Sequence, residues 1–142
     1  MNLIEKLFAP AEVKDAIKVL DEFKAGLSDK LSEDLYMAAA AENIHNKVRA
    51  SILENSKKIK EKVRSSDVNP KHVTIKLLLD TSQDFLASGE NHAYRGVLNG
   101  KGQATFKLFK HYLNEAKNHG MCDDSTVSNA IVNIEEQIKH HG

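Results

Sequence analysis

Hydrophobic positions recur every three to four residues along most of the chain, which is the spacing of an α-helix with one buried face. The first such stripe runs from Val13 to Leu27, and Gly26 predicts the end of its helix. Two similar stripes occupy the last third of the chain, and Gly120 separates them. The pattern therefore predicts helices over most of the sequence.

The longest helical pattern covers residues 29–64, since nothing there breaks a helix before the Ser65-Ser66 and Asn69-Pro70 pairs. A continuous helix of that length would measure about 50 Å. The sequence predicts one long spine helix, or a helix that bends near the polar residues 54–56.

The middle of the chain is harder to interpret. Residues 70–88 lie between a helix-starting Asn-Pro pair and a helix-ending glycine, yet residues 72–77 alternate like a strand. We favour a helix there, because no partner strand is visible elsewhere in the sequence. Residues 89–102 contain four glycines and are predicted to form a long loop.

Together these elements predict an all-α fold, a bundle of about five helices with the spine helix 29–64 and the Gly-rich loop 89–102. Residues 1–142 are interpreted as a single helical domain, a size at which one hydrophobic core suffices. Residues 1–9 are predicted to form an apolar N-terminal arm, which either covers the chain's own core or binds a partner. Its large hydrophobic residues are Leu3, Ile4, Leu7 and Phe8.

Composition and charge narrow the function classes. Twenty basic and twenty acidic residues give a net charge of +0, so the chain as a whole does not attract nucleic acid or anionic membranes. Cys122 is the only cysteine, which rules out an intramolecular disulfide. No apolar run approaches the ~20 residues that span a bilayer, and no signal peptide is recognisable, so we expect a cytoplasmic protein.

Three polar residues interrupt the apolar face of the spine helix. Glu42, His45 and Arg49 are three and four positions apart, so they can contact one another on that face. Buried polar groups require partners, because an unpaired buried charge is costly. One interpretation is a polar pocket that binds a ligand or transfers a proton. The other is a structural Glu–Arg ion pair beside a hydrogen-bonded histidine.

The loop 89–102 is a second candidate site. Arg95 and Lys101 supply positive charge before a predicted helix, whose free N-terminal amides attract phosphate or carboxylate groups. His92 and Tyr94 would line the same site as polar contacts. The glycine spacing differs from that of a P-loop, and the alternative is a connector whose glycines only make turns.

Neither metal-ligand pattern in the sequence is complete. Glu42-x-x-His45 resembles half of a di-iron carboxylate motif, but no second copy exists. His111, Glu115 and His119 share one stripe, which the helical wheel places opposite the apolar face. We therefore predict no metal and no cofactor.

The leading functional hypothesis is a non-catalytic interaction or regulatory module that binds a protein partner or itself, for example as a homodimer. One alternative is a sensor or enzyme for a small anionic ligand at the loop 89–102. The other is nucleic-acid binding through the basic segment 57–64, which lacks the aromatic residues that stack on bases.

Overall fold

The computed structural model describes residues 10–31, 35–66, 68–87, 92–94 and 97–140. Within these ranges the chain is almost entirely helical, as the hydrophobic periodicity predicts. The elements are α2 (Ala11–Leu31), α3 (Leu35–Glu54), α4 (Ser56–Ser66), α5 (Pro70–Ala87), β1 (His92–Tyr94), β2 (Val97–Leu98), α6 (Gly100–Asn118) and α7 (Asp124–His140).

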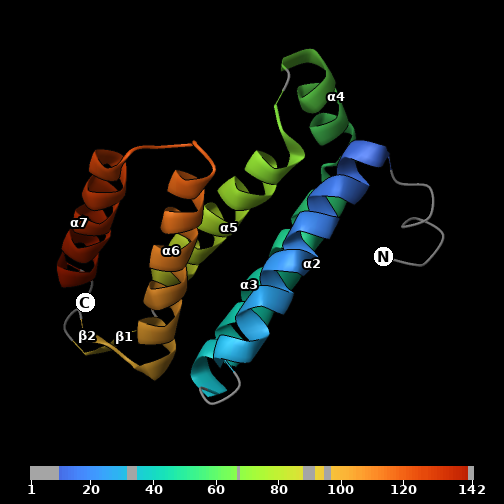
Figure 1. Cartoon of the computed structure of the whole chain (residues 1–142). Coiled ribbons are helices and arrows are strands. Elements are labelled where there is room, and N and C mark those ends of the chain that lie inside the picture. The colour runs from blue at the N-terminus through green and yellow to red at the C-terminus, as the bar shows by residue number, and fades with distance from the viewer. Residues whose placement is uncertain (1–9, 32–34, 67, 88–91, 95–96, 141–142) are drawn as a thin grey trace.

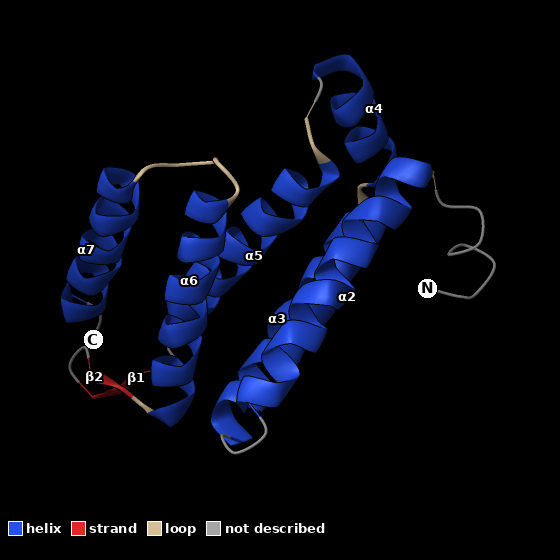
Figure 2. Cartoon of the chain, viewed as in Figure 1, coloured by secondary structure: helices blue, strands red, loops and turns tan. Residues whose placement is uncertain are grey.

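The long helices run alternately in opposite directions and form three layers (Figure 1). The α2–α3 pair packs on one side of the α5–α6 pair, and α7 packs on the other side. Helix α4 lies at one end of the bundle against α2, and the short β1–β2 hairpin lies at the opposite end (Figure 2). None of the helices in the described part of the chain combines the length and apolar character that crossing a membrane requires.

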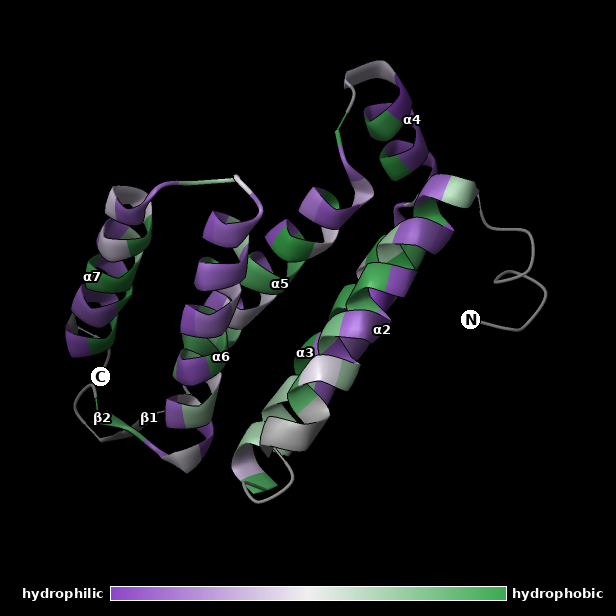
Figure 3. Cartoon of the chain, in the orientation of Figure 1, coloured by the Kyte–Doolittle hydropathy of each residue, from purple (hydrophilic) through white to green (hydrophobic). Residues whose placement is uncertain are grey.

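Two hydrophobic clusters hold these layers together. The larger lies between α2, α3, α5 and α6, and α4 adds Ile59 to it. The smaller lies between α5, α6 and α7 and contains Phe109 and Ile134. Hydrophobic residues of α7 accordingly face α6, while its hydrophilic residues point away (Figure 3). The α5–α6 pair is thus the shared middle layer of the fold.

The predicted spine helix 29–64 is wrong. The structure divides this stretch between the end of α2, α3 and α4, with a break at Asn55. There the Asn55 side chain donates to the Ser51 carbonyl at 2.8 Å, and the Ser56 hydroxyl donates to the Leu53 carbonyl at 2.7 Å. Such side-chain bonds compete with the helical backbone ladder, which explains the bend that the polar residues 54–56 suggested.

The prediction that Gly26 ends the first helix is also wrong, because α2 continues to Leu31. A glycine inside a helix costs about 1 kcal/mol relative to alanine. Leu27 lies one residue further on the same apolar stripe and is 5% exposed. Burial of a leucine is worth roughly 1.5–3 kcal/mol, which outweighs the glycine.

The helix favoured for residues 70–88 is confirmed as α5. The loop predicted for residues 89–102 is only partly correct, because β1 and β2 pair antiparallel and α6 already begins at Gly100. The Asn99 side chain accepts a hydrogen bond from the Gly102 amide at 2.9 Å and so caps α6. At the other end of α6, Gly120 adopts a φ of +74°, which glycine tolerates best.

The hydroxyl of Thr74 links the α2–α3 layer to the middle layer. Thr74 on α5 is fully buried, and its hydroxyl lies 2.8 Å from the Ala16 carbonyl of α2. Thr74→Val keeps the shape and removes the donor, so we expect a loss of about 1 kcal/mol of unfolding free energy in urea denaturation. Thr105→Val is the matched control, since the buried Thr105 hydroxyl bonds only within α6, to Lys101. Equal losses of unfolding free energy in the two variants would contradict a stabilising role for the Thr74–Ala16 hydrogen bond.

Candidate functional site

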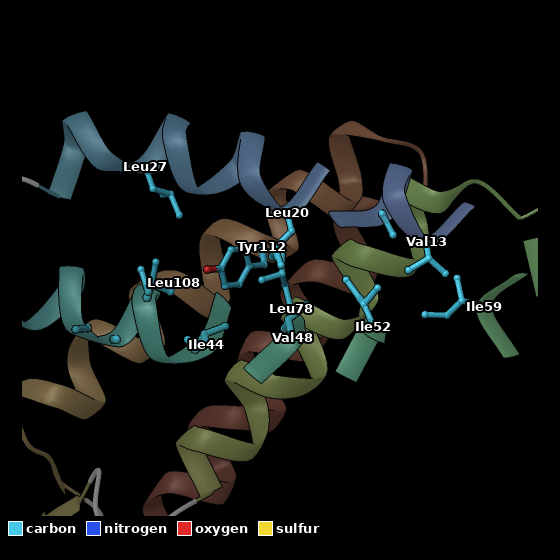
Figure 4. Close-up of a cluster of buried hydrophobic side chains, with 14 residues drawn as sticks. Val13, Leu20, Leu27, Ile44, Val48, Ile52, Ile59, Leu78, Leu108 and Tyr112 are labelled. Atoms are coloured by element: carbon cyan, nitrogen blue, oxygen red, sulfur yellow. The ribbon is translucent and has the colours of Figure 1, made fainter. Parts of the chain in front are cut away.

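A buried contact between two polar side chains joins α3 to α6. His45 is 2% exposed, and its Nε2 lies 2.9 Å from the hydroxyl of Tyr112, which is fully buried. The Tyr112 side chain reaches from α6 between α2 and α3 (Figure 4). No other acceptor for this hydroxyl is found among the described residues, so we assign Tyr112 as the donor. The ring proton of a neutral His45 then lies on Nδ1.

Burial decides the protonation of this pair. Desolvation, helped by the positive charges of Lys24 and Arg49, lowers the pKa of His45 from 6.5 to about 4, although the Leu20 carbonyl and Asp21 act in the opposite direction. Burial also raises the pKa of Tyr112 above its ordinary value. Both groups are therefore neutral at pH 7, and His45 Nδ1 is buried without a hydrogen bond of regular geometry.

An ion pair lies beside His45, but its acid is not the predicted one. Arg49 bonds to Asp21 on α2, and both side chains are partly exposed. Glu42 is exposed, so the prediction that it faces the core is wrong. Glu42 and Arg49 are seven positions apart and so lie within about 20° of each other, at the same margin of the apolar face. Of these two residues, Arg49 is paired with an acid of α2.

This cluster has the properties of a structural contact. The neutral His45–Tyr112 pair is inaccessible to solvent, and an exposed ion pair such as Asp21–Arg49 is worth at most about 1 kcal/mol. Of the three residues predicted here, the structure places the charge of Arg49 near the buried His45 and leaves Glu42 exposed. Sequence reasoning missed Tyr112 and Asp21. A tyrosine on the apolar stripe of α6 was a usable signal, because a buried tyrosine hydroxyl needs a partner.

The structure describes only part of the anion site predicted in the Gly-rich segment. His92 and Tyr94 belong to strand β1, but the structure does not describe their side chains, and Arg95 lies outside the described residues. Lys101 is exposed in the first turn of α6. The Gly102 amide, one of the donors an anion would use, is already bonded to Asn99.

The stripe on α6 is less exposed than predicted. His111, Glu115 and His119 are partly buried, and His119 Nε2 lies 3.5 Å from a Glu115 oxygen. The His119 ring meets Phe23 of α2 edge-on. Across the described ranges, no group of three histidine, cysteine or acidic side chains is arranged to hold a metal ion.

The basic segment 57–64 forms most of α4. Lys57, Lys58 and Lys62 are exposed, whereas Arg64 bonds to Glu12 on α2 and so attaches α4 to the bundle. The Arg64 hydrogen bond is the main cause that lowers the pKa of Glu12 below its ordinary value. One cation of the segment thus already has a partner within the fold.

The end of the bundle opposite α4 exposes large hydrophobic side chains. Leu35 and Tyr36, at the start of α3, are 83% and 61% exposed, and Val97 in β2 is 60% exposed. A Cβ atom on Gly100 would lie 3.1 Å from the Tyr36 ring, so the glycine allows this ring to rest on the start of α6. We call Leu35, Tyr36 and Val97, which lie at this end of the bundle, the apolar end. Sequence analysis did not single it out.

No protein family, no curated protein and no solved structure matches this chain.

Proposed function

We propose that this chain is a non-catalytic helical module that binds a second copy of itself through the apolar end. One observation carries the proposal. Among the described residues, four large hydrophobic side chains are exposed, and three of them, Leu35, Tyr36 and Val97, lie at the same end of the bundle. Grouped exposed hydrophobic residues are typical of protein interaction surfaces, whereas single ones are ordinary.

The energetics favour association at this place. Leu35 is exposed and has no role in the core. Its burial against a partner therefore contributes the whole free energy of burying a leucine side chain, roughly 1.5–3 kcal/mol. A tyrosine adds a large ring and a hydroxyl, a combination enriched at protein interfaces. The net charge of +0 means that two copies do not repel each other at long range.

The two alternative functions have weaker support. For an anionic ligand, Lys101 offers an exposed cation, but the nearby Gly102 amide is engaged by Asn99. For nucleic acid, exposed lysines of α4 offer charge, but Arg64 is engaged by Glu12. Among the residues that the structure describes, neither surface brings together several polar groups that converge on one ligand, so we do not prefer either alternative.

Analytical ultracentrifugation of two matched variants tests the proposal. Leu35→Asp places a charge on the apolar end, and an acid in the first turn of α3 also suits the helix dipole, so folding is preserved. We expect the wild type to dimerise at micromolar concentrations and Leu35→Asp to weaken the dimer at least tenfold. Val132→Asp is the control, because Val132 is an exposed large hydrophobic residue on a different helix, α7, and is 54% exposed.

Two results would overturn the proposal. The first is a wild-type chain that sediments as a monomer up to millimolar concentration. The second is a dimer that Leu35→Asp and Val132→Asp weaken equally, because the contact would then not be at the apolar end.

A further inference from the structure

Several side chains that attach α2 to its neighbours change charge in acid. Helix α2 is the first described element, since the predicted apolar arm of residues 1–9 lies outside the described residues. Asp21 of α2 pairs with Arg49 of α3, and Glu12 of α2 bonds to Arg64 of α4. A carboxylate that takes up a proton loses its charge, and with it most of its attraction to an arginine. Acid therefore weakens the contacts of α2 with both α3 and α4.

Helix α2 also closes over the buried His45 of α3. The His45 ring is 2% exposed, with the Tyr112 hydroxyl of α6 at its Nε2 atom and the Leu20 carbonyl of α2 facing it. Leu20 is itself fully buried and belongs to the same cluster as Tyr112 (Figure 4). Detachment of α2 would remove one wall around the His45 ring and admit water to it.

The surroundings of His45 disfavour a proton on its ring as long as α2 is in place. Burial is the largest cause, and the charges of Lys24 on α2 and Arg49 on α3 add to it, while Asp21 acts in the opposite direction. Helix α6 presents the neutral tyrosine hydroxyl, and α5 contributes the uncharged Leu78 to the same cluster. Opening of α2 removes Lys24 and hydrates the ring, so the open chain accommodates the proton better than the closed chain.

The contacts among α5, α6 and α7 depend less on charge. The cluster between these helices consists of hydrophobic residues such as Phe109. His72 of α5 donates to the His119 carbonyl of α6 at 3.2 Å, and a histidine that donates to a carbonyl keeps this bond when it is protonated. The Lys117–Asp124 pair between α6 and α7 is exposed, so little stability depends on it.

We propose that acid opens this fold at α2, which detaches from the bundle when His45 takes up a proton, while α5, α6 and α7 keep their packing. A proton that binds the open state better shifts the population toward that state, as any ligand does. Burial of Val13, Leu20 and Leu27 of α2 keeps the opening rare at neutral pH. Release of α2 uncovers the apolar faces of α3, α5 and α6, and it does not require self-binding.

Amide hydrogen exchange of the full chain, followed by mass spectrometry at pH 7 and pH 4, tests this inference. Each rate is corrected for the intrinsic effect of pH on exchange. Opening of α2 should become on the order of a hundredfold more frequent at pH 4, because the pKa of His45 is about 4 when buried and 6.5 when exposed. At pH 4 the amides of α2 should open at least about tenfold more often than those of α6, which stays folded.

Two variants separate the effect of the proton from that of packing. His45→Gln keeps a partner for the Tyr112 hydroxyl but does not titrate, so the rise in α2 opening should be at least about tenfold smaller than in the wild type. Thr74→Val is the matched control, because it removes a hydrogen bond to the Ala16 carbonyl of α2 without changing any charge. It should raise α2 opening about fivefold at both pH values alike.

Two results would overturn the inference. The first is equal opening of α2 and α6 at pH 4, because the chain would then unfold as one unit. The second is a His45→Gln chain in which α2 opening rises as steeply with acid as it does in the wild type. The comparison of α2 with α6 needs no variant, so it decides the question even where His45→Gln does not fold.

Discussion

Lowering the pH from 6.5 to about 4 is expected to reduce the free energy of unfolding by roughly 3 kcal/mol through His45 alone. Burial holds the pKa of His45 near 4 in the folded chain, whereas an unfolded histidine titrates near 6.5. Between these two values the unfolded state binds a proton that the folded state does not, so stability falls as the pH falls. Above pH 6.5 both states are neutral at this residue, and its contribution is fully present.

His45→Gln provides the comparison, because glutamine can bond to the Tyr112 hydroxyl but does not titrate. Urea denaturation at several pH values should show a steep loss in the wild type and a flatter profile in the variant between pH 6.5 and 4. Glu12 and Asp123 have lowered pKa values, so their stabilisation is lost as the pH falls from the ordinary carboxyl range through their folded pKa values. This loss is common to the wild type and the variant, so it does not affect the comparison. Parallel profiles for the two proteins would contradict the burial of a neutral His45.

Removal of either partner of the His45–Tyr112 contact is expected to lower the free energy of unfolding about as much as removal of both partners together. Tyr112→Phe leaves the buried Nε2 of His45 without its donor, and His45→Leu leaves the Tyr112 hydroxyl without its acceptor. Each single change should lower the free energy of unfolding by about 1–3 kcal/mol, the cost of an unsatisfied buried polar group. The double variant has no polar group left to satisfy, so its loss should be close to that of one single variant.

A double-mutant cycle measured by denaturation gives the coupling between the two residues. We expect a coupling of at least about 1 kcal/mol, since residues in direct contact are not additive. Leu108→Ala combined with Ile134→Ala is a suitable control, because these residues lie in the two different clusters, and their effects should add. Additive losses for His45→Leu and Tyr112→Phe would show that the hydrogen bond does not stabilise the fold.

The periodicity of hydrophobic residues was sufficient to predict the helical class, because each helix buries one stripe whatever its neighbours are. The periodicity was not sufficient to predict where each helix begins and ends. Gly26 and the stretch around Asn55 show opposite errors: a nominal helix breaker lies within α2, while a stretch without strong breakers is interrupted. In the first case burial of Leu27 outweighs the glycine, and in the second, side-chain bonds compete with the backbone. Both depend on contacts that local propensity does not contain.

The same limit applies to the candidate sites. The helical wheel placed His45 in the core correctly, yet its partner Tyr112 is 67 positions away in sequence. No local pattern pairs residues so distant. Glu42 and Arg49 lie at one margin of the apolar face, where burial depends on contacts with neighbouring helices that the local pattern does not contain. The apolar end was missed for a related reason, because Leu35 and Val97 are far apart in the sequence and lie at one end of the bundle only after the chain has folded.

The most direct test of the central claim, self-binding through the apolar end, is a dilution series followed by ¹H–¹⁵N NMR on the full-length chain. As the concentration rises, the account predicts progressive shifts of the amide signals of Leu35, Tyr36 and Val97, while that of Val132 stays unchanged. Signals at the apolar end that are independent of concentration, or shifts confined to α4 or α7, would contradict it.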